Sequence, residues 1–175
     1  VLLVGHSLGG QACLLHLARS RDPGVVAGLA LVAVGLPYWR VYRDRRRLWV
    51  LPFTQAIHAT ATVLRVWPGW GFGGRQARGV IRDWSFTART GRFPPIDGLD
   101  LDAAVAAVRV PVLAVSLERD QYTPAPTVDH LVGKLPAAPP VQREHYDGGA
   151  DHFSWARTAG PIADRVARFA ATISR

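Results

Sequence analysis

The chain has 175 residues, 49% of them hydrophobic, and a formal net charge of +8. This length and composition fit a single domain with a buried core. The single cysteine, Cys13, excludes an internal disulfide. The longest apolar run, from Val25 to Leu36, is interrupted by Gly28 and Gly35 and is too short to span a bilayer, so we expect no stable membrane insertion.

The positive charge is carried almost entirely by arginine, because Lys134 is the only lysine among 21 basic residues. The one dense cluster is Arg43-Asp44-Arg45-Arg46-Arg47. Basic clusters attract polyanions, but no zinc-ligand spacing or nucleic-acid-binding module accompanies this one. We therefore interpret the cluster as a solvated face and expect no nucleic-acid partner.

The first predicted elements are a strand over residues 1–4 and a helix over residues 8–20, joined by Gly5-His6-Ser7-Leu8-Gly9. This is a G-x-S-x-G sequence between a buried strand and a helix, the context in which such a serine is exposed on a sharp turn. Gly5 and Gly9 lack a Cβ, which lets the strand and the helix pass closely. The pattern predicts that Ser7 projects beyond the end of a sheet, where a substrate carbonyl can reach it.

Strands and helices alternate along the rest of the chain, except in an irregular insert at residues 36–99 that carries five of the six tryptophans. This alternation predicts an α/β fold with a parallel sheet, and the insert is the candidate for a lid near the carboxyl ends of the strands. On the first helix, Ala12, Cys13 and Leu15 are the expected buried residues. The other expected elements are strands at 25–34, 110–116 and 141–146 and helices at 101–108, 125–135 and 161–173.

A serine hydroxyl is a poor nucleophile near pH 7, so it needs a base to accept its proton and an acid to orient that base. In this arrangement the expected chain order is serine, then acid, then histidine. Asp120 follows the strand at 110–116 and precedes a turn into the next helix, and it is the expected acid. Glu118 lies nearer the strand and is the alternative.

The expected base is His152, which lies in the glycine-rich loop Asp147-Gly148-Gly149-Ala150-Asp151-His152 before the final helix. His145 falls within the last strand, and we expect it to have a structural role. His6 is inside the turn that holds Ser7, where its side chain is expected to point away from the serine. The remaining histidines lie on predicted helices or in the insert: His16, His58 and His130.

These residues predict an acyl-enzyme on Ser7 that is hydrolysed by water activated through His152. The tetrahedral intermediate needs two backbone donors for its negative oxygen. The N–H of Leu8 is one, and the other normally follows an earlier strand, upstream of Val1. This chemistry needs no cofactor and no metal, and the histidines and carboxylates lack a metal-ligand pattern such as H-E-x-x-H.

With these residues the chain resembles the α/β-hydrolase superfamily, from its nucleophile turn to its C-terminus. It looks most like the branch of serine aminopeptidases and monoglyceride-lipase-like esterases, and within it a bacterial group of predicted α/β-hydrolases. The resemblance implies that Ser7 is the nucleophile, Asp120 the acid, His152 the base and Leu8 an oxyanion donor. The match to the bacterial group is suggested by Gly5–Gln11, Pro37–Arg40, Asp83-Trp84, Gly91–Phe93 and Ser116–Pro124.

The chain departs from that family because the family's first four strands and first oxyanion loop are absent. By the family's strand order, the strand before Ser7 becomes an exposed edge, and an unpaired apolar edge favours aggregation. We therefore expect residues 1–175 to be a partial domain, a fragment that is poorly soluble, inactive or both on its own.

The expected function is that of a serine hydrolase, cleaving an ester or related acyl bond of a small, partly apolar substrate. Aminopeptidase, carbon–carbon hydrolase or acyltransferase activity on the same fold remains open, since fold does not choose among these. A non-catalytic binding protein on this scaffold is a further alternative. The acyl and leaving groups and the oligomeric state are left open, and the cytoplasm is the default location.

Overall fold

The computed structural model describes residues 1–20 and 23–173. Its contacts form two compact units. The sheet unit joins residues 1–35 to the part of the chain that begins at Leu101, and the insert unit comprises residues 36–100. No helix among the described residues is both long enough and apolar enough to cross a membrane.

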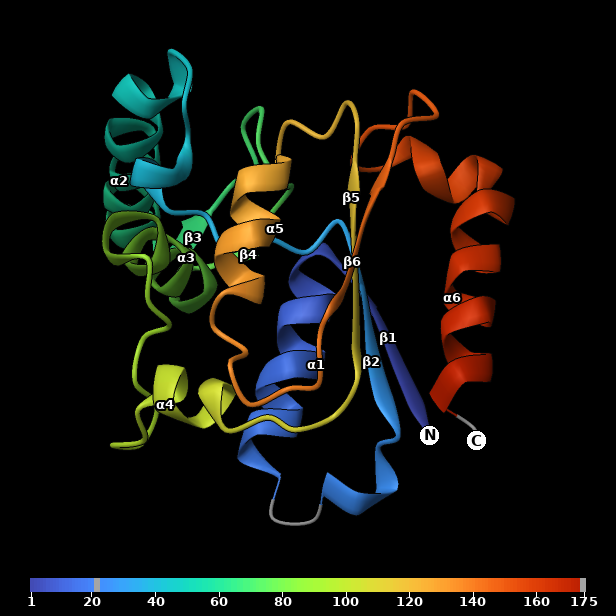
Figure 1. Ribbon diagram of the computed structural model, residues 1–175. Coiled ribbons are helices and arrows are strands. Elements are labelled where there is room, and N and C mark those ends of the chain that lie inside the picture. Colours follow the sequence, from blue (N-terminus) through green and yellow to red (C-terminus); the bar gives the residue numbers. More distant parts are fainter. Residues whose placement is uncertain (21–22, 174–175) are drawn as a thin grey trace. The chain divides into compact units, whose positions relative to one another are not determined.

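The sheet unit is built on four parallel strands in the order β1-β2-β5-β6 (Figure 1). The two central strands, β2 and β5, are buried along their whole length, as expected for parallel strands covered on both faces. Because all four run in the same direction, their carboxyl ends meet at one edge of the sheet. The strands are β1 (Leu2–His6), β2 (Gly28–Val32), β5 (Val112–Leu117) and β6 (Gln142–Tyr146).

Helices cover both faces of this sheet: α1 (Ser7–Arg19) and α5 (Ala125–Val132) lie on one face and α6 (Gly160–Ile173) on the other (Figure 1). On the α6 side, alternate residues of β2 and β5 pack with Ile162 and Phe169 to form a buried core. The predicted parallel α/β sheet with flanking helices is thereby confirmed. The shorter elements of the unit are η1 (Pro23–Val25), α4 (Leu101–Ala106) and η3 (Ser154–Thr158).

The buried face of α1 differs from the expected one. Ala12 is exposed, and Cys13 and Leu15 are only partly buried; the buried residues are instead Gly10, Leu14 and Leu17. Gly10 sets this phase, because a Cβ on it would collide with the side chain of Val34, so the helix must present its glycine to the sheet. Residues four and seven positions after Gly10 lie on the same face of the helix, and these are Leu14 and Leu17.

The boundaries of β2 also differ from the prediction. Residues 23–25 form the 3-10 turn η1, and the strand begins at Gly28. Pro23 begins this turn, which its fixed φ suits, and the turn takes Val25 out of the predicted strand.

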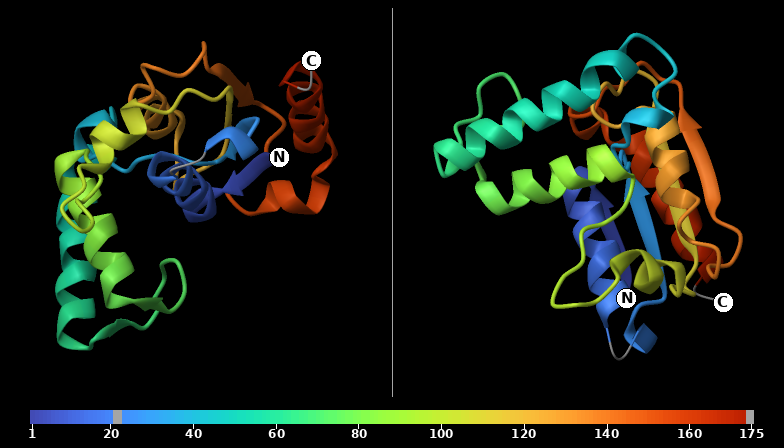
Figure 2. Two further views of the ribbon diagram at one scale, coloured as in Figure 1. Left: turned by 90° about the horizontal axis from the view of Figure 1, so that it is seen from below. Right: turned by 90° about the vertical axis from the view of Figure 1, so that its left-hand side faces the viewer.

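The insert unit is not irregular, contrary to the sequence-based expectation. Two helices, α2 (Arg46–Val63) and α3 (Arg78–Thr90), run side by side (Figure 2) around a small core of Ile57, Ala61, Trp67 and Ile81. The helical pattern of α2 is obscured by an internal proline, Pro52, and by several β-branched residues, which lower helix propensity. Packing outweighs that propensity. The unit also contains η2 (Trp39–Val41), β3 (Val66–Trp67) and β4 (Gln76–Ala77).

Candidate active site

Ser7 lies at the junction of β1 and α1, at the carboxyl edge of the sheet. Its φ is +51°, a left-handed conformation that costs free energy for a residue other than glycine. A Cβ on Gly5 would collide with the backbone of Gly10, so only glycine lets the strand and helix approach this closely. The G-x-S-x-G sequence thus folds as a tight strand-to-helix turn that presents the serine.

Three residues that are distant in sequence are joined by hydrogen bonds at this edge. The Nε2 of His152 lies 2.8 Å from the Oγ of Ser7, and its Nδ1 lies 2.8 Å from Oδ2 of Asp120. Ser7 begins α1, Asp120 follows β5, and His152 follows β6. The structure therefore brings together all three residues that the sequence analysis selected from separate loops.

The Asp120 carboxylate is completely buried and saturated with hydrogen bonds. Oδ1 accepts the backbone N–H groups of Tyr122 and Thr123, each at 2.8 Å, and Oδ2 lies 2.6 Å from the Thr123 hydroxyl. Burial acts to raise the pKa of Asp120, but the hydrogen bonds from His152 and Thr123 outweigh it and hold the pKa below its ordinary value.

An ionised Asp120 selects the tautomer of His152. A carboxylate can only accept hydrogen bonds, so Nδ1 of His152 carries the proton that faces it. Nε2 is then the unprotonated nitrogen, and it faces the Ser7 hydroxyl. The arrangement can thus accept the serine proton at Nε2 while a negative charge remains on the far side of the ring.

The alternative acid is engaged elsewhere. Glu118 is exposed, and its Oε2 accepts the backbone N–H of Gly149 at 2.8 Å. It therefore ties the loop after β5 to the loop that carries His152, without a hydrogen bond to the imidazole itself. His145 lies on β6, where its Nδ1 is 2.8 Å from the hydroxyl of Ser116.

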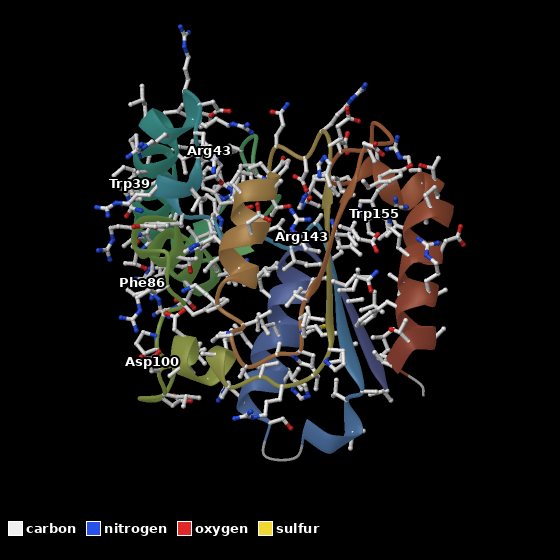
Figure 3. The ribbon with its side chains drawn as sticks, in the orientation of Figure 1. Trp39, Arg43, Phe86, Asp100, Arg143 and Trp155 are labelled. Atoms are coloured by element: carbon white, nitrogen blue, oxygen red, sulfur yellow. The ribbon has the colours of Figure 1, made fainter. Side chains whose placement is uncertain are left out.

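His6 is a site neighbour to which the sequence analysis gave no role. Its Nε2 lies 2.9 Å from the backbone carbonyl of His152, and the two imidazole rings are 4.8 Å apart. The His6 ring also lies 5.4 Å from that of Trp155, which lies between the sheet and α6 (Figure 3). Burial lowers the pKa of His6, and so does the repulsion that a protonated His152 would exert, so a neutral ring donates from Nε2 to the carbonyl.

Two aromatic rings also surround His152. Tyr122 stacks on the imidazole at 5.0 Å, and Phe153 meets it edge-on at 4.8 Å. Their places beside Asp120 and His152 in the sequence are the only signal that could have pointed to them. Nothing in a single sequence shows which side of the imidazole a neighbouring ring covers.

Leu8 is the second residue of α1. Its N–H is one of the first four of the helix, which have no acceptor within the helix and sit at the positive end of its dipole. This position suits a donor to a developing negative oxygen beside Ser7. The assignment of Leu8 as an oxyanion donor stays a prediction.

No known protein-family model matches this sequence, and no curated protein matches it. Solved structures do match. A candidate non-heme bromoperoxidase from Mycobacterium tuberculosis aligns with 99% of the chain at 16% identity and a TM-score of 0.60. A metagenome-derived lipolytic enzyme aligns with 96% at 13% identity and a TM-score of 0.64. A thermophilic esterase from Thermogutta terrifontis aligns with 99% at 13% identity and a TM-score of 0.55.

The chain spans about two thirds of these structures, covering 67%, 63% and 65% of their respective lengths. Within that span almost the whole chain aligns with each of them. At identities of this size the similarity shows the fold. The reaction has to be inferred from the geometry of the site. The chain therefore has the fold of the α/β-hydrolases, over the part of that fold that includes Ser7, Asp120 and His152.

Proposed function

We propose that this chain carries the catalytic residues of a serine hydrolase, which cleaves an ester or related acyl bond of a small, partly apolar substrate. The observation that carries the proposal is the unbroken series of hydrogen bonds from Asp120 through His152 to Ser7. The strained backbone of Ser7 supports it, because strain of this kind is concentrated at functional sites. The similarity of the fold to esterases and lipolytic enzymes adds to this support.

In the proposed reaction, the Ser7 hydroxyl attacks the substrate carbonyl while Nε2 of His152 accepts its proton. The imidazolium that forms is stabilised by the buried carboxylate of Asp120, which keeps its negative charge. His152 then returns the proton to the oxygen of the departing alcohol. The products of this half-reaction are the free alcohol and an acyl group esterified to Ser7.

Water completes the cycle by the same route. His152 removes a proton from water, the resulting nucleophile attacks the acyl group, and the proton returns to the Ser7 oxygen as the acid is released. The N–H of Leu8 would stabilise the negative oxygen in both steps. Such intermediates are normally stabilised by a second backbone donor as well. Losing one such donor costs about 10²–10³ in rate in studied cases.

The test is labelling with a fluorophosphonate, followed by peptide mapping. It is run in parallel on the 175-residue chain and on the full reading frame that contains it. We expect the label on Ser7 in the full reading frame, and its loss when His152 is replaced by glutamine. His145→Gln is the matched control and should label at the wild-type rate, because His145 contacts Ser116 instead.

A folded full-length protein that takes up no label would contradict the mechanism and favour a non-catalytic binding protein. Label on Ser7 would leave the choice between ester, peptide-terminal amide and carbon–carbon substrates to a substrate panel. The resemblance to the serine aminopeptidase and monoglyceride-lipase-like branch stays a prediction until that panel is run.

A further inference from the structure

Two exposed aromatic rings flank the buried imidazole of His152. The Tyr122 ring lies almost parallel to it, at an interplanar angle of 30°, whereas the Phe153 ring stands at 87° to it. The two rings also contact each other, with centroids 5.4 Å apart. Tyr122 is 40% exposed and Phe153 is 59% exposed, while only 4% of the His152 side chain is accessible. Apolar ring surface is therefore open to a ligand directly beside the base.

The proton pathway decides which part of a substrate meets these rings. The nitrogen that takes the serine proton, Nε2 of His152, is the same one that later protonates the leaving oxygen. That oxygen must come within hydrogen-bond reach of Nε2, about 2.6–3.2 Å. The group attached to the leaving oxygen therefore lies next to whatever packs on the imidazole. The acyl group, by contrast, is attached to Ser7 and stays on the serine side.

We propose that Tyr122 and Phe153 form the leaving-group subsite of this enzyme, and that the subsite selects a flat, apolar alcohol such as a benzyl group. This inference rests on the proposed serine hydrolase function. Aromatic rings prefer offset-stacked or edge-to-face partners, and the exposed parts of Tyr122 and Phe153 would offer such contacts to a planar leaving group.

Short hydrogen bonds fix the backbone from which both rings project before any substrate arrives. The N–H of Tyr122 donates to Oδ1 of Asp120 at 2.8 Å, so the carboxylate that orients His152 also anchors the residue that stacks on it. The N–H of Phe153 donates to Oδ1 of Asp151 at 2.9 Å, and the same oxygen accepts the N–H of Ser154 at 2.7 Å. A subsite fixed in this way loses little freedom when it binds a ligand.

The experiment compares three butyrate esters whose alcohols are similar in acidity: methyl, cyclohexylmethyl and benzyl. Because the acyl group is the same, deacylation is identical, and kcat/KM reports the acylation step in which the alcohol leaves. For the full-length protein we expect kcat/KM to be highest for the benzyl ester. Cyclohexylmethyl, equal in bulk but not flat, should fall between benzyl and methyl.

The variants Phe153→Leu and Tyr122→Leu keep apolar bulk and remove one ring each. Each should lower kcat/KM for the benzyl ester by roughly two- to twelvefold, the worth of one aromatic contact, and leave the methyl ester within about twofold. The control is Trp70→Leu, an exposed aromatic residue of the insert unit, which should change none of the three values.

Fluorophosphonate labelling of every variant distinguishes a failure of the subsite from a failure of the hydrolase proposal. A wild-type labelling rate with equal losses for methyl and benzyl esters, or with no benzyl preference, would overturn the subsite while the hydrolase proposal stands. A selective loss for the benzyl ester supports the subsite. Absence of labelling in the wild-type protein would instead overturn the proposed function on which the subsite depends.

Discussion

The sheet unit and the insert unit differ in how they use charge. Residues 36–100 contain eleven arginines and four aspartates, a net charge of +7, whereas the rest of the chain carries only +1. Both units bury a few polar side chains, but the sheet unit gathers several hydrogen bonds on Asp120 and Thr123. Buried polar groups are costly unless they are satisfied in this way. The comparison indicates that the sheet unit is constrained residue by residue, whereas the insert is constrained mainly in its small core.

The largest effect is expected in the sheet unit, from Asp120→Asn. An amide cannot stabilise the imidazolium, and it can donate to Nδ1 and so favour the wrong tautomer of His152. We expect the rate of hydrolysis to fall by about 10⁴, as for such a substitution in a comparable triad. The measurement is kcat/KM on the benzyl ester, with Glu118→Gln as control. An equal fall of kcat/KM in Glu118→Gln would contradict the assignment of Asp120 and indicate Glu118 as the acid.

Within the insert unit, Trp67→Ala tests whether the small core holds that unit together. Trp67 is 5% exposed, and its indole N–H donates to the carbonyl of Phe72 at 2.8 Å. The loss of packing should cost about 3–5 kcal/mol of stability, read from hydrogen exchange of the α2 and α3 amides. The exposed neighbour Trp70 is the control, and its replacement by alanine should cost less than about 0.5 kcal/mol.

A smaller effect is expected from His6→Phe, which keeps a ring beside His152 and removes the hydrogen bond to its carbonyl. We expect fluorophosphonate labelling of Ser7 to slow by about tenfold, through a loosened base loop. His16→Phe, on the exposed side of α1, should leave labelling unchanged. A wild-type rate in His6→Phe would mean that the hydrogen bond plays no part in holding the base.

The pH dependence of folding stability tests His6 by a measurement that does not involve catalysis. Its pKa is lowered in the folded chain, so the unfolded chain binds more protons between that lowered value and the ordinary value of about 6.5. Stability therefore falls as the pH drops through this window. His6→Phe should remove this part of the loss, measured as a smaller decrease in Tm between pH 7 and pH 5 than in the wild-type chain.

The core of the sheet, and the convergence of Ser7, Asp120 and His152 at one edge of it, could be predicted because their signals are local. A G-x-S-x-G turn between an apolar strand and a helix specifies Ser7 almost by itself, and Asp120 and His152 each follow a recognisable strand. The parallel sheet then brings these loops together, since the carboxyl ends of parallel strands lie at the same edge. The role of the insert as a lid was also inferred from sequence and stays a prediction.

The parts that escaped prediction depend on contacts between distant segments. The phase of α1 is fixed by Gly10 against Val34, and the helices of the insert are stabilised by each other despite Pro52. The contact of His6 with His152 joins residues 146 positions apart. A periodic pattern records which residues are apolar, but it does not record which partner they meet.

The separation of Ser7 and His152 also has a consequence for how the chain acquires its final structure. The two side chains are 145 positions apart in sequence, and their hydrogen bond requires both β1 and the loop after β6, at opposite ends of the sheet, to be in place. Pairings between such remote segments form late and slow the folding of a domain. Reactivity of the serine would then appear only when the last strand is in place. During refolding, the return of reactivity at Ser7 would therefore measure the rate of the final folding step.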